Sequence, residues 1–153
     1  MKKHNFFAGP AILPDSVLIK AGEAIKDFKG MGLSILEISH RSDEFVESLE
    51  NAISLAKELV NAPDNYEALF LTGGASSQFF MTAMNLLGES ENAGYINTGS
   101  WSTKAIKEAK HFGNIIELAS SKDSNFRHIP KDYALPKEMR YLHYTSNNTI
   151  FGT

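Results

Sequence analysis

The sequence predicts an α/β fold, a mainly parallel sheet with flanking helices, on two observations. Short apolar runs that favour strands alternate with amphipathic segments of about ten residues that favour helices. Glycine-containing turns, at 72–76 and 97–101, stand where a strand run gives way to a helical one. Because parallel strands need a crossover connection, this alternation indicates βαβ units, with ligands expected at the carboxyl ends of the strands.

The first sixty-five residues predict two helices. Asp15 is expected to cap the first, whose apolar residues recur at helical spacing as far as Phe28, before Gly30. Residues 32–39 are a short stretch with β-forming character. Ser42 is expected to cap a second amphipathic helix that carries apolar residues from Phe45 to Leu59.

The rest of the chain predicts one sheet with helices between its strands. The expected helices cover Ser77–Leu87 and Trp101–His111. The expected strands are Tyr66–Leu71, Ala93–Asn97, Asn114–Leu118 and Arg140–Tyr144. Consecutive strands joined through a helix should pair in parallel.

The amino-acid composition excludes several classes of function for this chain. The chain has 153 residues, 42% hydrophobic and 22% charged, with a net charge of −3, so it has no overall basic field for nucleic acid. No apolar run approaches the roughly 18 to 20 residues of a membrane span, and no apolar signal core precedes Gly9. The absence of cysteine excludes disulfides and thiolate metal sites. We therefore expect a cytoplasmic location and small-molecule chemistry.

The turn Thr72–Gln78 is the most informative segment, because a helix N-terminus presents unpaired N–H groups and partial positive charge to a phosphate. It matches neither the dinucleotide fingerprint nor the P-loop. On the residues alone, a phosphate site and a plain turn into a helix are equally well supported.

Three further segments have both a ligand and a structural interpretation. Trp101 could stack on a planar cofactor, although packing beneath its loop is the favoured alternative. Arg41, beside His40, could grip phosphate or carboxylate, or simply be solvated next to a helix cap. The polar run Tyr144–Thr149 could orient a ligand or form local turns.

Two other features are assigned no role in binding. The five histidines lack metal-ligand spacing, so we expect no metal site. The lysines at 104, 107 and 110 are interpreted as a solvated helix face.

Taken in order, these segments resemble the phosphoserine aminotransferases, pyridoxal-phosphate enzymes of the aspartate-aminotransferase fold. The resemblance rests on five collinear blocks that together span essentially the whole chain. They are Asn5–Pro14, Ser39–Ser42, Gly73–Phe79, Thr98–Ser102 and Ser146–Gly152.

This resemblance implies reversible amino transfer between O-phosphoserine and 2-oxoglutarate, giving 3-phosphohydroxypyruvate and glutamate, in serine biosynthesis. It implies that Ala75 and Ser76 bind the phosphate of pyridoxal 5'-phosphate. Trp101 would stack on the cofactor ring, and Thr149 would hydrogen-bond its phenolic oxygen. His40 and Arg41 would receive substrate anions, partly across the interface of a homodimer.

Two positions depart from the family pattern. Ala8 stands where many members have Ser, which puts a substrate contact there in doubt. Ser76 stands where others have Arg in the glycine turn, which removes a cationic partner of the phosphate.

The resemblance also places the family's Schiff-base lysine, and the aspartate that pairs with the pyridine nitrogen, beyond the matched region. None of the twelve lysines here falls at a matching position. We therefore expect residues 1–153 to be the N-terminal segment and part of the cofactor-binding large domain of a fold-type I enzyme, with no catalytic residue and without the C-terminal half. Alone, such a chain is expected to be inactive. The alternative is a non-catalytic module that binds a phosphate ligand or a partner.

Overall fold

The computed structural model describes residues 3–153, which divide into two compact units. The first runs to Phe70 and the second covers Leu71–Thr153. Among residues 3–153, none of the helices combines the length and the apolar character that a membrane span requires.

The N-terminal unit contains the two expected helices, α1 (Asp15–Lys26) and α2 (Asp43–Leu59). The predicted cap of α1 is wrong by one residue, because the Pro14 carbonyl accepts the N–H groups of Val17 and Leu18. Asp15 is instead the first helical residue, where its negative charge interacts favourably with the positive end of the helix dipole. Ser42 is confirmed as the cap of α2, but through its backbone carbonyl, since its hydroxyl donates to the Ser39 carbonyl.

The stretch at residues 32–39 forms turns, so its predicted β-forming character is wrong. The Phe28 amide donates to the Leu33 carbonyl, and the Ile35 amide donates to the Ala24 carbonyl. Gly30 and Gly32 have φ angles of 75° and 71°, which favour glycine. The backbone groups are thus satisfied locally, and no neighbouring strand is needed.

The expected strand Tyr66–Leu71 is also wrong, because this segment is irregular in the structure. Leu69 and Phe70 are 75% and 63% exposed. A strand forms only where a partner satisfies its backbone groups, and the sheet of the second unit contains only β1, β2 and β3 among the described residues. Without such a partner, an apolar segment of β-forming residues does not become a strand.

The second unit carries the remaining elements in the predicted order. They are α3 (Gly74–Leu86), β1 (Asn92–Asn97), α4 (Ser100–Ala109), β2 (Asn114–Ser120), the 3₁₀ turn η1 (Lys122–Ser124) and β3 (Leu142–His143). The strands lie in the order β2-β1-β3, and both pairs are parallel, which confirms the α/β fold with a parallel sheet. The last strand is much shorter than expected, since only Gly94 and Tyr95 pair with it.

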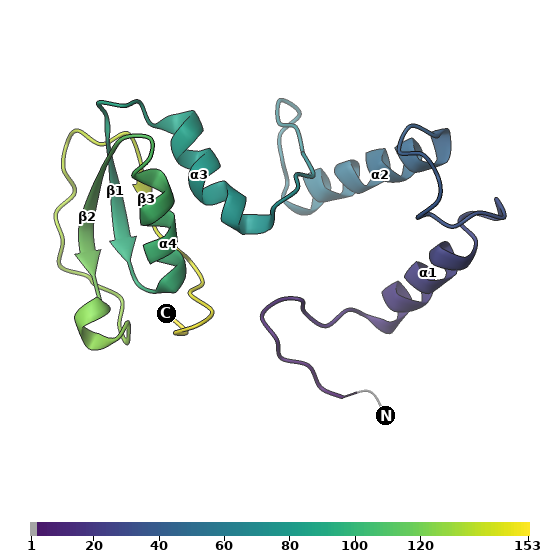
Figure 1. Cartoon of the computed structure of the whole chain (residues 1–153), viewed down its shortest axis with the longest axis horizontal. Coiled ribbons are helices and arrows are strands. Elements are labelled where there is room, and N and C mark those ends of the chain that lie inside the picture. Colours follow the sequence, from purple (N-terminus) through teal and green to yellow (C-terminus); the bar gives the residue numbers. More distant parts are fainter. Residues whose placement is uncertain (1–2) are drawn as a thin grey trace. The chain divides into compact units, whose positions relative to one another are not determined.

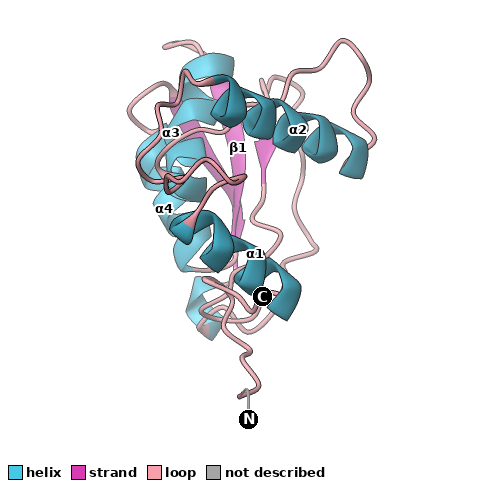
Figure 2. Ribbon diagram, turned by 90° about the vertical axis from the view of Figure 1, so that its right-hand side faces the viewer, coloured by secondary structure: helices cyan, strands magenta, loops and turns pink. Residues whose placement is uncertain are grey.

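The core of this unit lies between the sheet and two helices. In Figures 1 and 2, α4 lies against the sheet and α3 lies beside α4, in agreement with their contacts. Small residues on α4 allow close packing, and β1 is buried along nearly its whole length. The central cluster comprises Ala83, Leu87, Ala93, Tyr95, Ala105, Ile106 and Ala109.

Next to this cluster, His143 stacks on Tyr95 with the two ring centroids 4.7 Å apart. Its Nδ1 atom is buried and has no hydrogen-bond partner in the part of the chain that the structure describes. Burial lowers the pKa of His143. Burial, followed by the hydrogen bond to Tyr141, raises the pKa of Tyr95.

We expect the free energy of unfolding to fall as the pH drops below about 6.5, the ordinary histidine pKa. His143 binds a proton more tightly when unfolded than when folded, so its contribution is fully present above that pH and is lost toward its lower folded pKa. Urea unfolding between pH 5 and 8 measures the slope. The change His143→Phe should flatten it and His111→Phe, at an exposed site, should not; an equal slope in wild type and His143→Phe would contradict this assignment.

We expect Gly113→Ala to destabilise the second unit by about 1–3 kcal/mol, as overpacking does. A Cβ atom there would lie 2.7 Å from Leu87 Cγ and 2.8 Å from the Gly88 carbonyl oxygen, so the backbone must shift. The matched control is Gly88→Ala, whose Cβ would approach only the flexible Glu91 side chain, at 3.3 Å. Thermal denaturation of both variants provides the measurement, and similar midpoints would show that the Gly113 contact is not tight.

Candidate functional site

The glycine turn enters α3 through two residues with left-handed backbone conformations. Gly73 has a φ of 108° and Gly74 a φ of 62°. A Cβ on Gly73 would meet Ser77 Oγ, and side chains rarely accompany a φ in this range, so this position favours glycine. The helix begins at Gly74, three residues before the predicted start, which makes Ala75 and Ser76 part of its first turn.

The first turn of α3 has unpaired amides. The first amides of an α-helix have no partner within the helix, and in α4 the first amide to donate to the cap carbonyl of Gly99 is that of the fourth residue, Thr103. Within residues 3–153 no such bond is formed by the amides of Gly74, Ala75 or Ser76, and Gly73 has no side chain to cap them. The positive end of α3 is therefore available to an anion.

Trp101 lies in the first turn of α4, directly after β1. Its indole Nε1 donates to Thr149 Oγ1 at 2.9 Å. This bond joins the start of α4, which follows β1, to the loop after β3, as expected when the carboxyl ends of parallel strands meet at one edge. Since Thr149 Oγ1 accepts from the indole, its hydroxyl hydrogen remains available to another acceptor.

Asn148 anchors the loop that carries Thr149. Its side chain is 1% exposed and donates to Thr98 Oγ1 at 2.8 Å and to Ser102 Oγ at 3.3 Å. Gly99 permits this approach, because a Cβ on it would lie 2.5 Å from Asn148 Oδ1. The two roles expected for Tyr144–Thr149, orienting a ligand and forming local turns, do not include this anchoring contact of Asn148.

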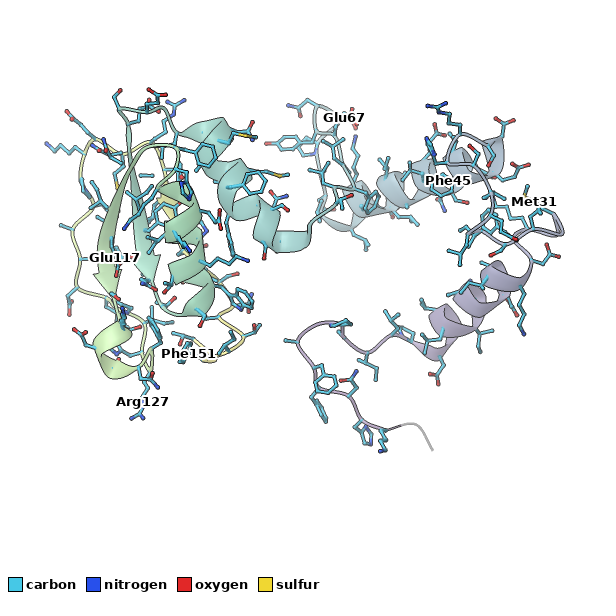
Figure 3. All side chains as sticks on the ribbon, viewed as in Figure 1. Met31, Phe45, Glu67, Glu117, Arg127 and Phe151 are labelled. Carbon is cyan, nitrogen blue, oxygen red and sulfur yellow. The ribbon has the colours of Figure 1, made fainter. Side chains whose placement is uncertain are left out.

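A second contact holds the end of the same loop. The rings of Phe126 and Phe151 lie 4.8 Å apart between centroids, and Thr153 Oγ1 donates to the Phe126 carbonyl. Figure 3 shows Phe151 close to the turn that carries Arg127. The loop after β3 is thus attached to the rest of the second unit on both sides of Ile150.

These segments line a partly open cavity of about 360 Å³, which we call the cradle cavity. It is lined by Gly73, Gly74, Ala75, Ser76, Phe79, Trp101, Thr145, Ser146, Asn147 and Thr149. The structure therefore brings together all four residues that the resemblance implies for the cofactor, although they come from three separate segments. Thr145 Oγ1, on the same lining, is buried and has no partner among the described residues.

The cavity lining fits a ligand with a phosphate and a flat ring. The open amides of α3 and the Ser76 hydroxyl suit an anion. The indole of Trp101 and the ring of Phe79 supply apolar surface, and the hydroxyls of Thr145 and Thr149 supply polar contacts. The phosphate interpretation of the turn is thus better supported by the structure than by the residues alone.

Lys104 lies next to this cavity, so the interpretation of the three lysines as one solvated face is wrong for this residue. Its Nζ donates to Ser76 Oγ at 3.1 Å, and its side chain is half-buried between α4 and α3. Lys107 and Lys110 are exposed. An interval of three residues turns a helix by about 300°, so the three lysines drift around α4, and only tertiary packing selects the one that meets Ser76.

His40 and Arg41 belong to the N-terminal unit, in the turn before α2. Both are exposed, and the Arg41 amide donates to Ser39 Oγ at 3.1 Å. Neither side chain takes part in an ion pair among residues 3–153. The same described residues contain no group of three or more His, Cys, Asp or Glu side chains that could hold a metal ion.

Comparison with known proteins gives consistent results. The family model described as "Aminotransferase class-V" matches residues 4–153. Phosphoserine aminotransferase of Flavobacterium psychrophilum is 54% identical over 154 residues, covering 100% of this chain and 43% of the relative. The same enzyme of Desulfotalea psychrophila is 55% identical, covering 98% and 42%. The chain thus spans less than half the length of these relatives.

Solved structures show the same fold. Phosphoserine aminotransferase from Bacillus circulans subsp. alkalophilus matches with a TM-score of 0.84 and 44% identity, over 95% of this chain and 41% of that one. The PLP-bound enzyme from Trichomonas vaginalis matches with a TM-score of 0.87 and 31% identity, over 99% and 43%.

We expect Asn148→Ala to lower the free energy of unfolding of the second unit by about 1–3 kcal/mol, because buried polar groups lose their partner. The loop that carries Thr149 should also become more sensitive to proteolysis. The matched control is Asn147→Ala, since Asn147 is exposed and its side chain donates only to Ser146 Oγ. Urea unfolding and limited proteolysis test this, and equal behaviour of the two variants would refute the anchoring role.

Proposed function

Because the chain belongs to the aminotransferase class-V family, we propose that it forms the cofactor-binding part of a phosphoserine aminotransferase. The proposed reaction is the reversible transfer of an amino group between O-phosphoserine and 2-oxoglutarate, with pyridoxal 5'-phosphate as cofactor. Identities of 54% and 55% to enzymes of that name support the substrate assignment.

The observation that carries the proposal is the convergence of Ala75, Ser76, Trp101 and Thr149 on the cradle cavity. A phosphate would accept hydrogen bonds from the amides of Ala75 and Ser76 at the positive end of α3. Trp101 would cover one face of the ring. Thr149, whose hydroxyl hydrogen is free because its oxygen accepts from Trp101, would donate to an oxygen on the ring.

When bound, pyridoxal phosphate supplies an electron sink that stabilises negative charge on the amino-bearing carbon of the substrate. The residues of this chain bind and orient that group. The lysine that would move the proton has no counterpart at a matching position here, so the proposal assigns binding and orientation, rather than proton transfer, to these 153 residues.

Substrate binding is assigned to Arg41 and His40 in the N-terminal unit. The Arg41 guanidinium is exposed and forms no ion pair among the described residues, so it is available to a phosphate or carboxylate. We propose that the complete enzyme acts as a homodimer in the cytoplasm, in serine biosynthesis, and that these residues meet substrate partly at the partner's site.

A non-catalytic phosphate-binding module is the second candidate, because the described lining of the cradle cavity offers hydrogen bonds to a phosphate and contains no lysine that could hold the ligand covalently. The two functions are separated by incubating the complete enzyme with pyridoxal 5'-phosphate, followed by dialysis and absorbance, because these 153 residues alone are expected to release the ligand under either function. A ligand that is merely bound is released by dialysis, whereas a covalently held one is retained and absorbs near the visible edge.

We expect Ser76→Asp to weaken pyridoxal 5'-phosphate binding by about tenfold or more, because a carboxylate beside the phosphate repels it. Trp101 is the only tryptophan and lines the cavity, so its fluorescence reports binding. The control Ser90→Asp adds the same charge at an exposed turn and should leave the affinity unchanged. An affinity of Ser76→Asp equal to that of wild type would count against the phosphate site.

A further inference from the structure

We propose that Lys104 is a positioning residue for the cofactor phosphate: its ammonium group orients the Ser76 hydroxyl toward the phosphate and adds one positive charge beside it. The inference rests on the proposed function, because it concerns the same cradle cavity. It assigns a role to a side chain outside the lining of that cavity.

The ammonium group of Lys104 lies next to the cradle cavity but outside its lining. Lys104 Nζ lies 3.1 Å from Ser76 Oγ, and Ser76 lines the cavity whereas Lys104 does not. The bond spans the contact between α3 and α4, which pack against each other, so the position of Lys104 is set by the helix pair.

Hydrogen-bond chemistry fixes the direction of the Ser76 hydroxyl. An ammonium group has only donors, so Ser76 Oγ must be the acceptor in this bond. The hydroxyl hydrogen then remains free, and the cavity is the place where it can meet an acceptor. A serine hydroxyl can donate or accept a hydrogen bond, and the bond from Lys104 leaves Ser76 to act as a donor. A fully ionised phosphate only accepts hydrogen bonds, so it requires such a donor.

Charge balance supports the same role. The segment Thr72–Phe79 contains no Lys or Arg, so the turn brings no cation of its own to a dianion. The two ion pairs within residues 3–153 are Lys29–Glu47 and Arg140–Glu91, and neither involves Lys104. The ammonium group of Lys104 is thus not neutralised by a carboxylate among the described residues, and its full positive charge is available to a bound phosphate.

The test compares pyridoxal 5'-phosphate with pyridoxal, which lacks the phosphate, in titrations of the 153-residue chain followed by Trp101 fluorescence. Wild type should bind the phosphorylated ligand more tightly. Lys104→Met should weaken that binding by roughly ten- to hundredfold, the loss typical of a hydrogen bond to a charged group, and leave pyridoxal binding unchanged. Lys104→Arg should restore most of the preference, and the exposed control Lys107→Met should retain all of it.

A double-mutant cycle tests whether Lys104 acts through Ser76. In the Ser76→Ala background, Lys104→Met should cost clearly less than in wild type, because the hydroxyl that it orients is gone. Fully additive losses would overturn the positioning role. Circular dichroism checks the fold of each variant, and Lys104→Gln serves as the neutral variant should Lys104→Met not give the wild-type spectrum.

The outcomes separate the two proposals. If wild type shows no preference for the phosphorylated ligand, the proposed function fails, and the role of Lys104 fails with it. If wild type shows the preference and Lys104→Met keeps it, only the role of Lys104 is overturned. Equal losses for both ligands in Lys104→Met would show a purely structural effect and would also overturn it.

Discussion

The buried side chain of Asn148 is the constraint on which the candidate site depends. It ties the loop after β3 to Thr98, at the end of β1, and to Ser102, in the first turn of α4. Gly99 makes the approach possible because it has no side chain. With this anchor in place, Thr149 reaches the indole of Trp101, and the two loops form one wall of the cradle cavity.

Parallel strand pairing brings these loops to the same edge. Because β1 pairs in parallel with both β2 and β3, the chain leaves β1 and β3 at one end of the sheet. The short β3 is sufficient for this purpose, since two paired residues fix its direction. The sheet therefore acts mainly as a support that fixes where the functional loops begin.

The opposite wall of the cradle cavity comes from α3. All three described strands follow this helix in the chain, so no strand of the sheet leads into its first turn. Its first turn is held by packing against α4 and by the bond between Lys104 and Ser76. The open amides of α3 contribute partial positive charge, and Lys104 contributes a full one. An anion-binding end is thus assembled from two helices instead of from the glycine turn alone.

The sequence by itself determined the alternation of helices and strands in the second unit and the glycine turn, because helical period, strand composition and glycine conformation are local properties. The four residues proposed to hold the cofactor came from the resemblance to a family and not from these local properties. The sequence did not determine whether Tyr66–Leu71 is a strand, which depends on a backbone partner elsewhere. Nor did it separate Lys104 from Lys107, or identify Asn148 as an anchor. Those roles depend on contacts between segments far apart in the chain, which only tertiary packing brings within hydrogen-bonding distance.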